Sequence, residues 1–170
     1  INYKWSENKL HCISLDKNTD LLKKKILHFI KTINIDYLSV GIINKLFEYG
    51  FDTLKKILNK TKKELLTIDG IKDTLASKIY SSIHIIIDKP IYLGTLMVAS
   101  LEFNSGIGIK KIEKILTKYP NIMDFQNKPY VNSLENIKKI SSIDGFQEKT
   151  ARQFVDNFGN FMIFLTNHKY

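Results

Sequence analysis

The feature that most constrains how this chain can fold is an internal repeat. Residues 66–76 read LTIDGIKDTLA, and residues 141–151 read SSIDGFQEKTA. Both segments place Ile-Asp-Gly before an apolar residue and an alanine at the same offset, and Asp144 follows Asp69 by 75 positions. Repetition of this kind indicates that the fold is built from copies of one unit, each stacked on its neighbour.

A second, looser pair of segments precedes these two. Residues 38–42 read LSVGI and residues 105–109 read SGIGI, so Gly108 follows Gly41 by 67 positions. We name the four segments turn A (38–42), turn B (68–72), turn A′ (105–109) and turn B′ (143–147). Their order predicts a duplicated pair of turns, and we call each pair with its flanking segments a double unit.

The segments around the turns have helical periodicity. From 21 to 33, Leu22, Ile26 and Phe29 belong to a stripe of apolar residues spaced three and four apart, which predicts an amphipathic helix. Residues 1–15 alternate instead and predict a short β-hairpin with a turn at 6–9. Similar helical stripes occupy 42–49, 52–59, 74–87, 91–102, 109–118, 133–141 and 148–158.

The chemistry of these turns suits a phosphate. Apolar-Gly-apolar-Gly between two helices is the pattern of a helix-hairpin-helix, in which glycine adopts positive φ and allows close backbone approach. Exposed N–H groups then lie beside the positive end of the next helix dipole. Small residues such as Ala76 and Ala151 allow the two helices to pack closely. We expect the apolar residue of each turn to fill the gap between its helices, namely Val40, Ile71, Ile107 and Phe146.

The four turns differ in their glycines. Turn A′ alone keeps both, Gly106 and Gly108, so we expect it to be the best donor of amide groups. Ser39 replaces the leading glycine in turn A, whereas Lys72 and Gln147 replace the trailing glycine in turns B and B′. Including basic residues near the turns, the predicted DNA-binding residues are Ser39, Val40, Gly41, Gly70, Ile71, Lys72, Lys78, Gly106, Ile107, Gly108, Lys110, Lys111, Gly145, Phe146, Gln147, Lys149 and Arg152.

Charge supports a polyanionic partner. The chain has 26 Lys and Arg against 17 Asp and Glu, a formal charge of +9, which favours nucleic acid or an anionic membrane. Lysines interrupt every apolar run, so we expect no membrane span. Because Cys12 is the single cysteine and the four histidines lack ligand spacing, we predict no disulfide and no metal site. Asp69 and Asp144 are better explained as turn caps than as metal ligands.

The order of the turns resembles the C-terminal region of NAD-dependent DNA ligases, bacterial or from large DNA viruses. The resemblance runs from about Leu22 to the end and is strongest over 25–50 and 63–83. It implies a platform along the minor groove of duplex DNA, with nicked DNA as the expected partner. It also implies upstream nucleotidyltransferase and OB-fold domains, with NAD and Mg²⁺ as cofactors of the parent enzyme. Here Asp-Gly is not preceded by the Lys-x of the ligase motif, so this fragment should be non-catalytic and hold no cofactor.

One departure from that family is the absence of a four-cysteine zinc module. We therefore expect residues 1–20 to form a metal-free substitute held by Tyr3 and Trp5. Residues 21–170 should form a mainly α, tandem helix-hairpin-helix domain with double units at 21–88 and 89–170. The chain begins at Ile1 rather than Met, which we interpret as a fragment of a longer intracellular protein, cytoplasmic or wherever its DNA is replicated.

The expected function is sequence-independent binding of duplex DNA within a ligase of replication and repair. Two alternatives remain open: a DNA-binding subunit or domain of a repair nuclease, and a non-enzymatic protein-interaction scaffold. A helix-hairpin-helix glycosylase fits less well, because Asp156 lacks the preceding proline-rich loop. Affinity for DNA that falls with salt would separate the DNA-binding functions from the scaffold.

Overall fold

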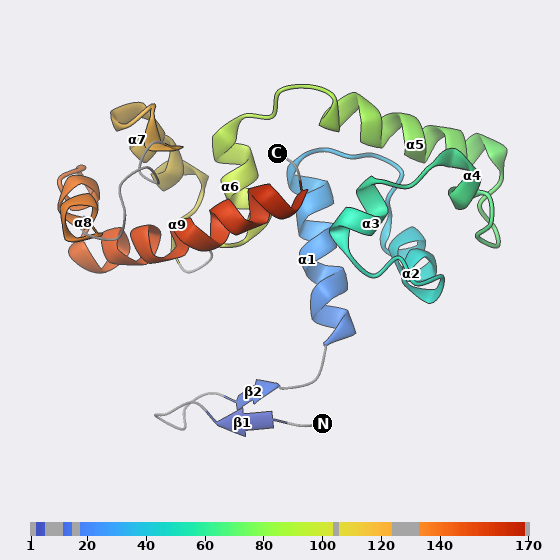
Figure 1. Ribbon diagram of the computed structural model, residues 1–170, viewed down its shortest axis with the longest axis horizontal. Coiled ribbons are helices and arrows are strands. Elements are labelled where there is room, and N and C mark those ends of the chain that lie inside the picture. Colours follow the sequence, from blue (N-terminus) through green and yellow to red (C-terminus); the bar gives the residue numbers. More distant parts are fainter. Residues whose placement is uncertain (1–2, 6–11, 15–17, 104–105, 124–132, 169–170) are drawn as a thin grey trace.

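The computed structural model describes residues 3–5, 12–14, 18–103, 106–123 and 133–168 (Figure 1). Strands β1 (Tyr3–Trp5) and β2 (Cys12–Ser14) pair antiparallel, with Lys4 opposite Ile13. The predicted turn at 6–9 and the side chains of Tyr3 and Trp5 lie outside what the structure describes. All other regular elements in the described ranges are helices.

Helices occur in all eight segments whose periodicity predicted them. A short helix at 62–65 was not predicted, and the last helix extends to His168 rather than to 158. Polar caps fix several of the starts: the Asn18 side chain accepts from the Leu21 N–H, and Thr61 forms a capping box with Glu64. The helices are α1 (Thr19–Thr32), α2 (Val40–Glu48), α3 (Leu54–Leu58), α4 (Lys62–Leu65), α5 (Asp73–Ile87), α6 (Leu93–Ser100), α7 (Ile109–Lys118), α8 (Ser133–Ser141) and α9 (Glu148–His168).

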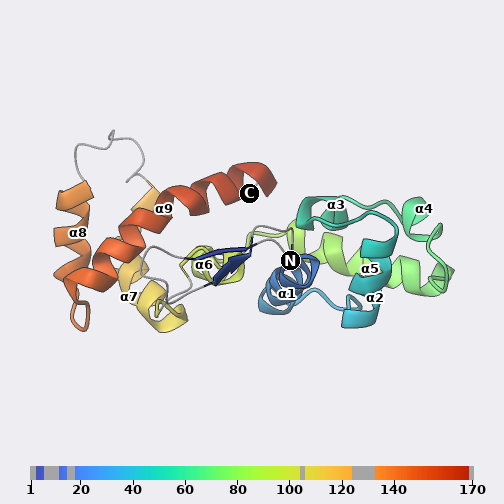
Figure 2. The ribbon, with the colours of Figure 1, turned by 90° about the horizontal axis from the view of Figure 1, so that it is seen from below.

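The helices form two groups along an elongated molecule. Helices α1 to α5 lie on the right of Figures 1 and 2, and α6 to α9 lie on the left. Turn A joins α1 to α2, and turn B joins α4 to α5. Turns A′ and B′ join α6 to α7 and α8 to α9 in the same way, so the order predicted from the repeat is the order in the fold.

The two groups share one hydrophobic core, and α1 is the helix that joins them. It packs against α2 in its own group and against α6 in the other, where His28 Nε2 is 3.1 Å from the carbonyl oxygen of Val98. The rings of Phe29 in α1 and Phe164 in α9 are 5.9 Å apart between centroids. Within the second group, Phe103 stacks on Phe154 at 4.9 Å. These contacts make the two groups one packed body.

Each of the four turns has the same three-residue arrangement. First comes a residue with positive φ: Tyr37 (64°), one position before the predicted start of turn A, Gly70 (76°), Gly106 (85°) or Gly145 (82°). Next comes an apolar residue exposed by no more than 8%: Leu38, Ile71, Ile107 or Phe146. The third residue immediately precedes a helix: Ser39, Lys72, Gly108 or Gln147. The predicted filling residues of turns B, A′ and B′ are thus confirmed as buried.

The prediction for turn A was wrong by two residues. Val40 is 54% exposed, and Leu38, at 5%, fills the gap between α1 and α2 instead. The reason is that the Ser39 hydroxyl accepts from the Ile42 N–H, which starts α2 at Val40 and turns that side chain outward. Gly41 therefore lies inside α2, and the residue equivalent to Gly108 is Ser39, 69 positions earlier.

Candidate nucleic-acid interface

No side chain caps the N-terminus of the helix that follows turn B or of the helix that follows turn A′. The N-cap residues of α5 and α7, Lys72 and Gly108, make no side-chain hydrogen bond to the first-turn amides. The Lys111 N–H of α7 donates to the carbonyl oxygen of Gly108 at 3.0 Å. The amides before it in the first turn of a helix have no intrahelical acceptor, so they are available to an external one. A Cβ added at Gly106 or Gly108 would meet nothing within 4 Å, which leaves the approach to turn A′ clear. The start of α2 differs, because Ser39 already caps it.

The structure places most of the predicted binding residues at the surface. Three of the predicted residues, Ile71, Ile107 and Phe146, are buried and can offer a ligand only their backbone. Lys111 is half-buried. The exposed members of the predicted set are Ser39, Val40, Gly41, Gly70, Lys72, Lys78, Gly106, Gly108, Lys110, Gly145, Gln147, Lys149 and Arg152.

Several predicted basic side chains have partners within the protein. Lys111 Nζ donates to the carbonyl oxygen of Gly106 at 2.9 Å, closing over its own turn. Arg152 forms an ion pair with Glu148 at 3.0 Å, and both side chains are largely exposed. Lys78 Nζ lies 5.4 Å from the centre of the Tyr37 ring, a cation–π contact at the side of turn A.

Two lysines that the sequence did not single out make the same contact in the two double units. Lys45 Nζ in α2 donates to the carbonyl oxygen of Asp69 at 2.9 Å. Lys114 Nζ in α7 donates to the carbonyl oxygen of Asp144 at 3.1 Å. Each lysine is six residues beyond the residue that precedes its helix, Ser39 or Gly108. The equivalence was hidden because the sequence comparison aligned Gly41 with Gly108.

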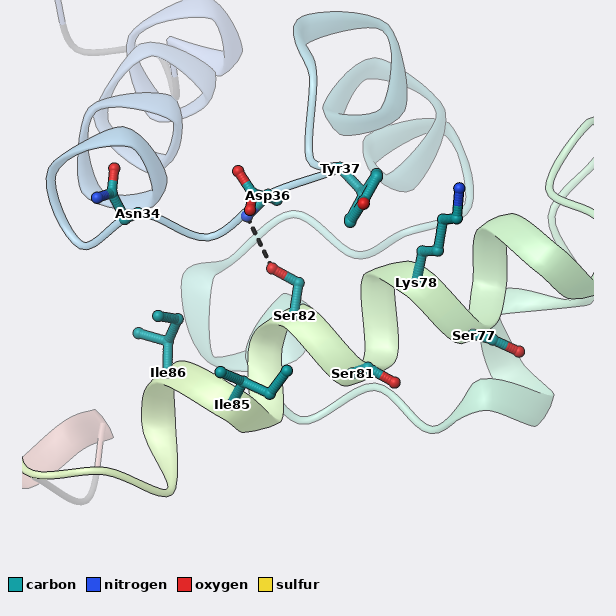
Figure 3. Close-up of a pocket in the computed structure, with 9 residues that line it drawn as sticks. All are labelled: Asn34, Asp36, Tyr37, Ser77, Lys78, Ser81, Ser82, Ile85 and Ile86. Carbon is teal, nitrogen blue, oxygen red and sulfur yellow. Dashed lines mark hydrogen bonds between the residues drawn. The ribbon is translucent and has the colours of Figure 1, made fainter.

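A groove of about 430 Å³ lies between α5 and the segment 34–37, which follows α1 (Figure 3). Ser82 Oγ accepts from the backbone N–H of Asp36 at 2.8 Å, which ties the connection before α2 to the middle of α5. The residues that line the groove are Asn34, Asp36, Tyr37, Ser77, Lys78, Ser81, Ser82, Ile85 and Ile86. The groove therefore carries hydroxyl groups and one lysine beside an exposed tyrosine ring.

Acidic residues near the turns show no metal-binding arrangement. Asp69 and Asp144 are exposed, and the Asp69 N–H donates to Tyr49 Oη at 3.0 Å. No group of three or more His, Cys, Asp or Glu able to hold a metal ion occurs among the residues that the structure describes. Within the same ranges, no helix combines the length and the apolar character needed to cross a bilayer.

The four turns and their flanking helices define a class of protein. Residues 29–84 and 99–158 match the family described as a SAM-like helix-hairpin-helix tandem, and the chain belongs to that family. Among curated relatives, it is 39% identical over 168 residues to a DNA ligase of Acanthamoeba polyphaga mimivirus. It is 32% identical over 168 residues to a putative DNA ligase of Invertebrate iridescent virus 6. A DNA ligase of the bacterium Campylobacter hominis is 29% identical over 126 residues.

These alignments cover most of this chain but only a small part of each relative. They include 96%, 98% and 74% of this chain but 26%, 25% and 18% of the respective relatives. The chain thus spans about a quarter of the length of the first two ligases. No solved structure matches it.

Proposed function

We propose that this chain binds duplex DNA without regard to sequence, through the backbone amides of its four turns, as the C-terminal part of a DNA ligase. The observation that carries the proposal is the fourfold arrangement of positive φ, buried apolar residue and helix start, with Gly70, Gly106 and Gly145 exposed at three of the turns. Backbone contacts to phosphate fix register and orientation on a duplex, but they carry no base information.

The placement of the turns supports an extended contact. Turn B lies at the right end of the long axis and turn B′ at the left end (Figures 1 and 2). A duplex that touches both must therefore run along the molecule. The excess of nine positive charges favours its approach.

The role of the parent protein is also part of the proposal. We infer an intracellular, NAD-dependent ligase that seals nicks in replication and repair, with NAD and Mg²⁺ acting in its upstream nucleotidyltransferase and OB-fold domains. The similarity to viral and bacterial ligases supports the ligase assignment. This chain lacks a Lys-x-Asp-Gly motif, so the nucleotide chemistry belongs to other domains. Sealing of a nicked duplex by the whole protein with NAD, and not with ATP, tests this assignment.

The direct test of DNA binding uses Gly108→Leu. Gly108 has extended backbone (φ −90°, ψ −179°) and open space around its Cβ position, so leucine fits without strain but covers the start of α7. Loss of a charge-assisted hydrogen bond of about 1.5–3 kcal/mol should weaken binding roughly tenfold or more. Fluorescence anisotropy with two unrelated 30-base-pair duplexes should show equal losses.

The matched control is Gly159→Leu in α9, another exposed glycine with nothing within 4 Å of its Cβ position. This variant should bind as tightly as the parent chain. Affinity of the parent should fall with salt at a log-log slope of about −0.9 per phosphate contacted. Absence of salt-dependent binding to either duplex would refute the proposal and favour the protein scaffold.

A further inference from the structure

Lys45 and Lys114 form an equivalent pair whose contacts link the two turns of each double unit. We propose that each ammonium group binds one DNA phosphate beside the second turn of its unit, Lys45 at turn B and Lys114 at turn B′. Each site is thus composite: the backbone comes from the second turn, and the charge comes from the helix that follows the first turn. This inference rests on the proposed function and names the side chains that act there.

The lysines reach their positions because glycine stands opposite them. Each Nζ bonds the carbonyl oxygen of the residue just before a positive-φ glycine, Gly70 or Gly145. A Cβ on Gly70 would overlap Lys45 Nζ, and a Cβ on Gly145 would lie 3.4 Å from Lys114 Nζ. The absence of a side chain at these glycines lets an ammonium group lie directly against the turn.

The charge of both lysines is available to a ligand. Four other lysines have a carboxylate oxygen within 2.8 Å: Lys56, Lys60, Lys62 and Lys139. Among the described residues, no carboxylate lies within 4.0 Å of Lys45 Nζ. Lys114 Nζ has one at 3.9 Å, from the fully exposed Asp144. An ammonium has three donors, so the bond to the carbonyl leaves the others free for phosphate.

Internal repetition separates this pair from the basic residues predicted from the turns. The basic residues predicted from the turns have no basic equivalent in the other unit: Lys72 corresponds to Gln147, and Lys110 corresponds to Gly41. The remaining pairs are Lys78 with Gln153, Lys111 with Ile42, Lys149 with Thr74, and Arg152 with Ser77. Lys45 and Lys114, by contrast, keep both the charge and the contact in the two copies.

A purely structural role does not explain why the residue is lysine. A side-chain amide or hydroxyl can satisfy a carbonyl, and fixing a long charged side chain costs more conformational entropy. The ammonium group supplies what those groups lack, a full positive charge next to the backbone of the turn. This positive charge attracts the negatively charged phosphate oxygens of DNA.

The test replaces the ammonium while keeping the aliphatic stem, with Lys45→Met, Lys114→Met and the double variant. Binding of a 30-base-pair duplex is measured by anisotropy across a series of KCl concentrations. Each single variant should reduce the magnitude of the log-log salt slope by about 0.9, and the double variant by about twice that. The control Lys25→Met removes an exposed lysine of α1 and should leave the slope unchanged.

The outcomes separate this inference from the proposed function. Unchanged slopes in both single variants, even with lower melting temperatures, would show that the lysines only brace the turns. If Gly108→Leu still weakens binding in that case, the proposed function stands and this inference fails. If the parent chain shows no salt-dependent binding, the proposed function itself fails. Because the two lysines lie in different units, loss of folding in one variant leaves the other as an independent test.

Discussion

Gly70→Ala should destabilise the fold more than Gly106→Ala, although both glycines have positive φ, 76° and 85°. A left-handed conformation costs a residue with a Cβ about 1–2 kcal/mol, and both variants share that cost. The surroundings differ. Nothing lies within 4 Å of a Cβ at Gly106, whereas a methyl group at Gly70 must displace Lys45 Nζ.

The displaced ammonium gives the difference in magnitude. Lys45 donates to the carbonyl oxygen of Asp69 at 2.9 Å, in an exposed position where a hydrogen bond contributes about 1 kcal/mol net. Gly70→Ala should therefore cost about 2–3 kcal/mol, against about 1–2 kcal/mol for Gly106→Ala. In a domain of this size the extra cost lowers the melting temperature by about 2–4 °C.

The assay is urea and thermal unfolding of both variants, alone and combined with Lys45→Met. Without the ammonium, Gly70→Ala should cost no more than Gly106→Ala, which gives a coupling energy of about 1 kcal/mol between Gly70 and Lys45. Equal destabilisation by the two alanine variants, or additive effects of Gly70→Ala and Lys45→Met, would refute the reasoning.

Three further predictions concern other parts of the fold. In urea unfolding, Leu38→Ala should lower the free energy of unfolding by about 2–5 kcal/mol and Val40→Ala by less than about 0.5 kcal/mol. The reverse order would mean that Val40, and not Leu38, fills the gap between α1 and α2. Hydrogen bonds from Lys60, and then from the backbone N–H and the hydroxyl of Thr61, lower the pKa of Glu64 from 4.5 to about 2. The ionised Glu64 carboxylate therefore contributes its full stabilisation above pH 4.5, and this stabilisation is lost as pH falls toward 2. Glu64→Gln should flatten that part of the plot of unfolding free energy against pH. A plot unchanged by the substitution would contradict this. Phe103→Ala should cost about 3–5 kcal/mol, measured by calorimetry, because the ring is 2% exposed and stacked on another; a loss below about 1 kcal/mol would contradict its core role.

The helices and three of the turns could be predicted because their signals are local. Apolar residues three and four apart mark one face of a helix, and most of these faces contribute to the core. In the predicted stripe at 21–33, Ile26 and Phe29 are buried, whereas Leu22 is 38% exposed. In turns B, A′ and B′, a glycine with positive φ precedes the buried apolar residue, so the sequence displays the conformation directly. Ala76 and Ala151, predicted to allow close packing, are both fully buried.

The conformation of turn A could not be predicted from its sequence, because the residue with positive φ is Tyr37 rather than a glycine. Its conformation is supported by distant groups: Ser82 bonds the backbone of Asp36, and Lys78 lies over the tyrosine ring. These contacts join residues 46 and 41 positions apart, so they leave no periodic or glycine signal. The nearest glycine, Gly41, therefore set the wrong register.

Two further features were missed for different reasons. The helix at 62–65 is too short to show periodicity, although the Thr61 and Glu64 capping box is a recognisable start signal. The contacts of Lys45 and Lys114 depend on how the two turns of each unit pair in space, and the equivalence of Ser39 with Gly108 has no glycine to mark it in the sequence.

The position of α1 has a consequence for how the protein unfolds. Helix α1 precedes turn A and packs against α2, and it is also the surface against which α6 and Phe164 pack. Loosening either group removes buried contacts of the other, so the two copies should denature in a single step despite being separate repeats. Amide hydrogens of α1 should accordingly exchange with deuterium only through global opening, and as slowly as any in the chain.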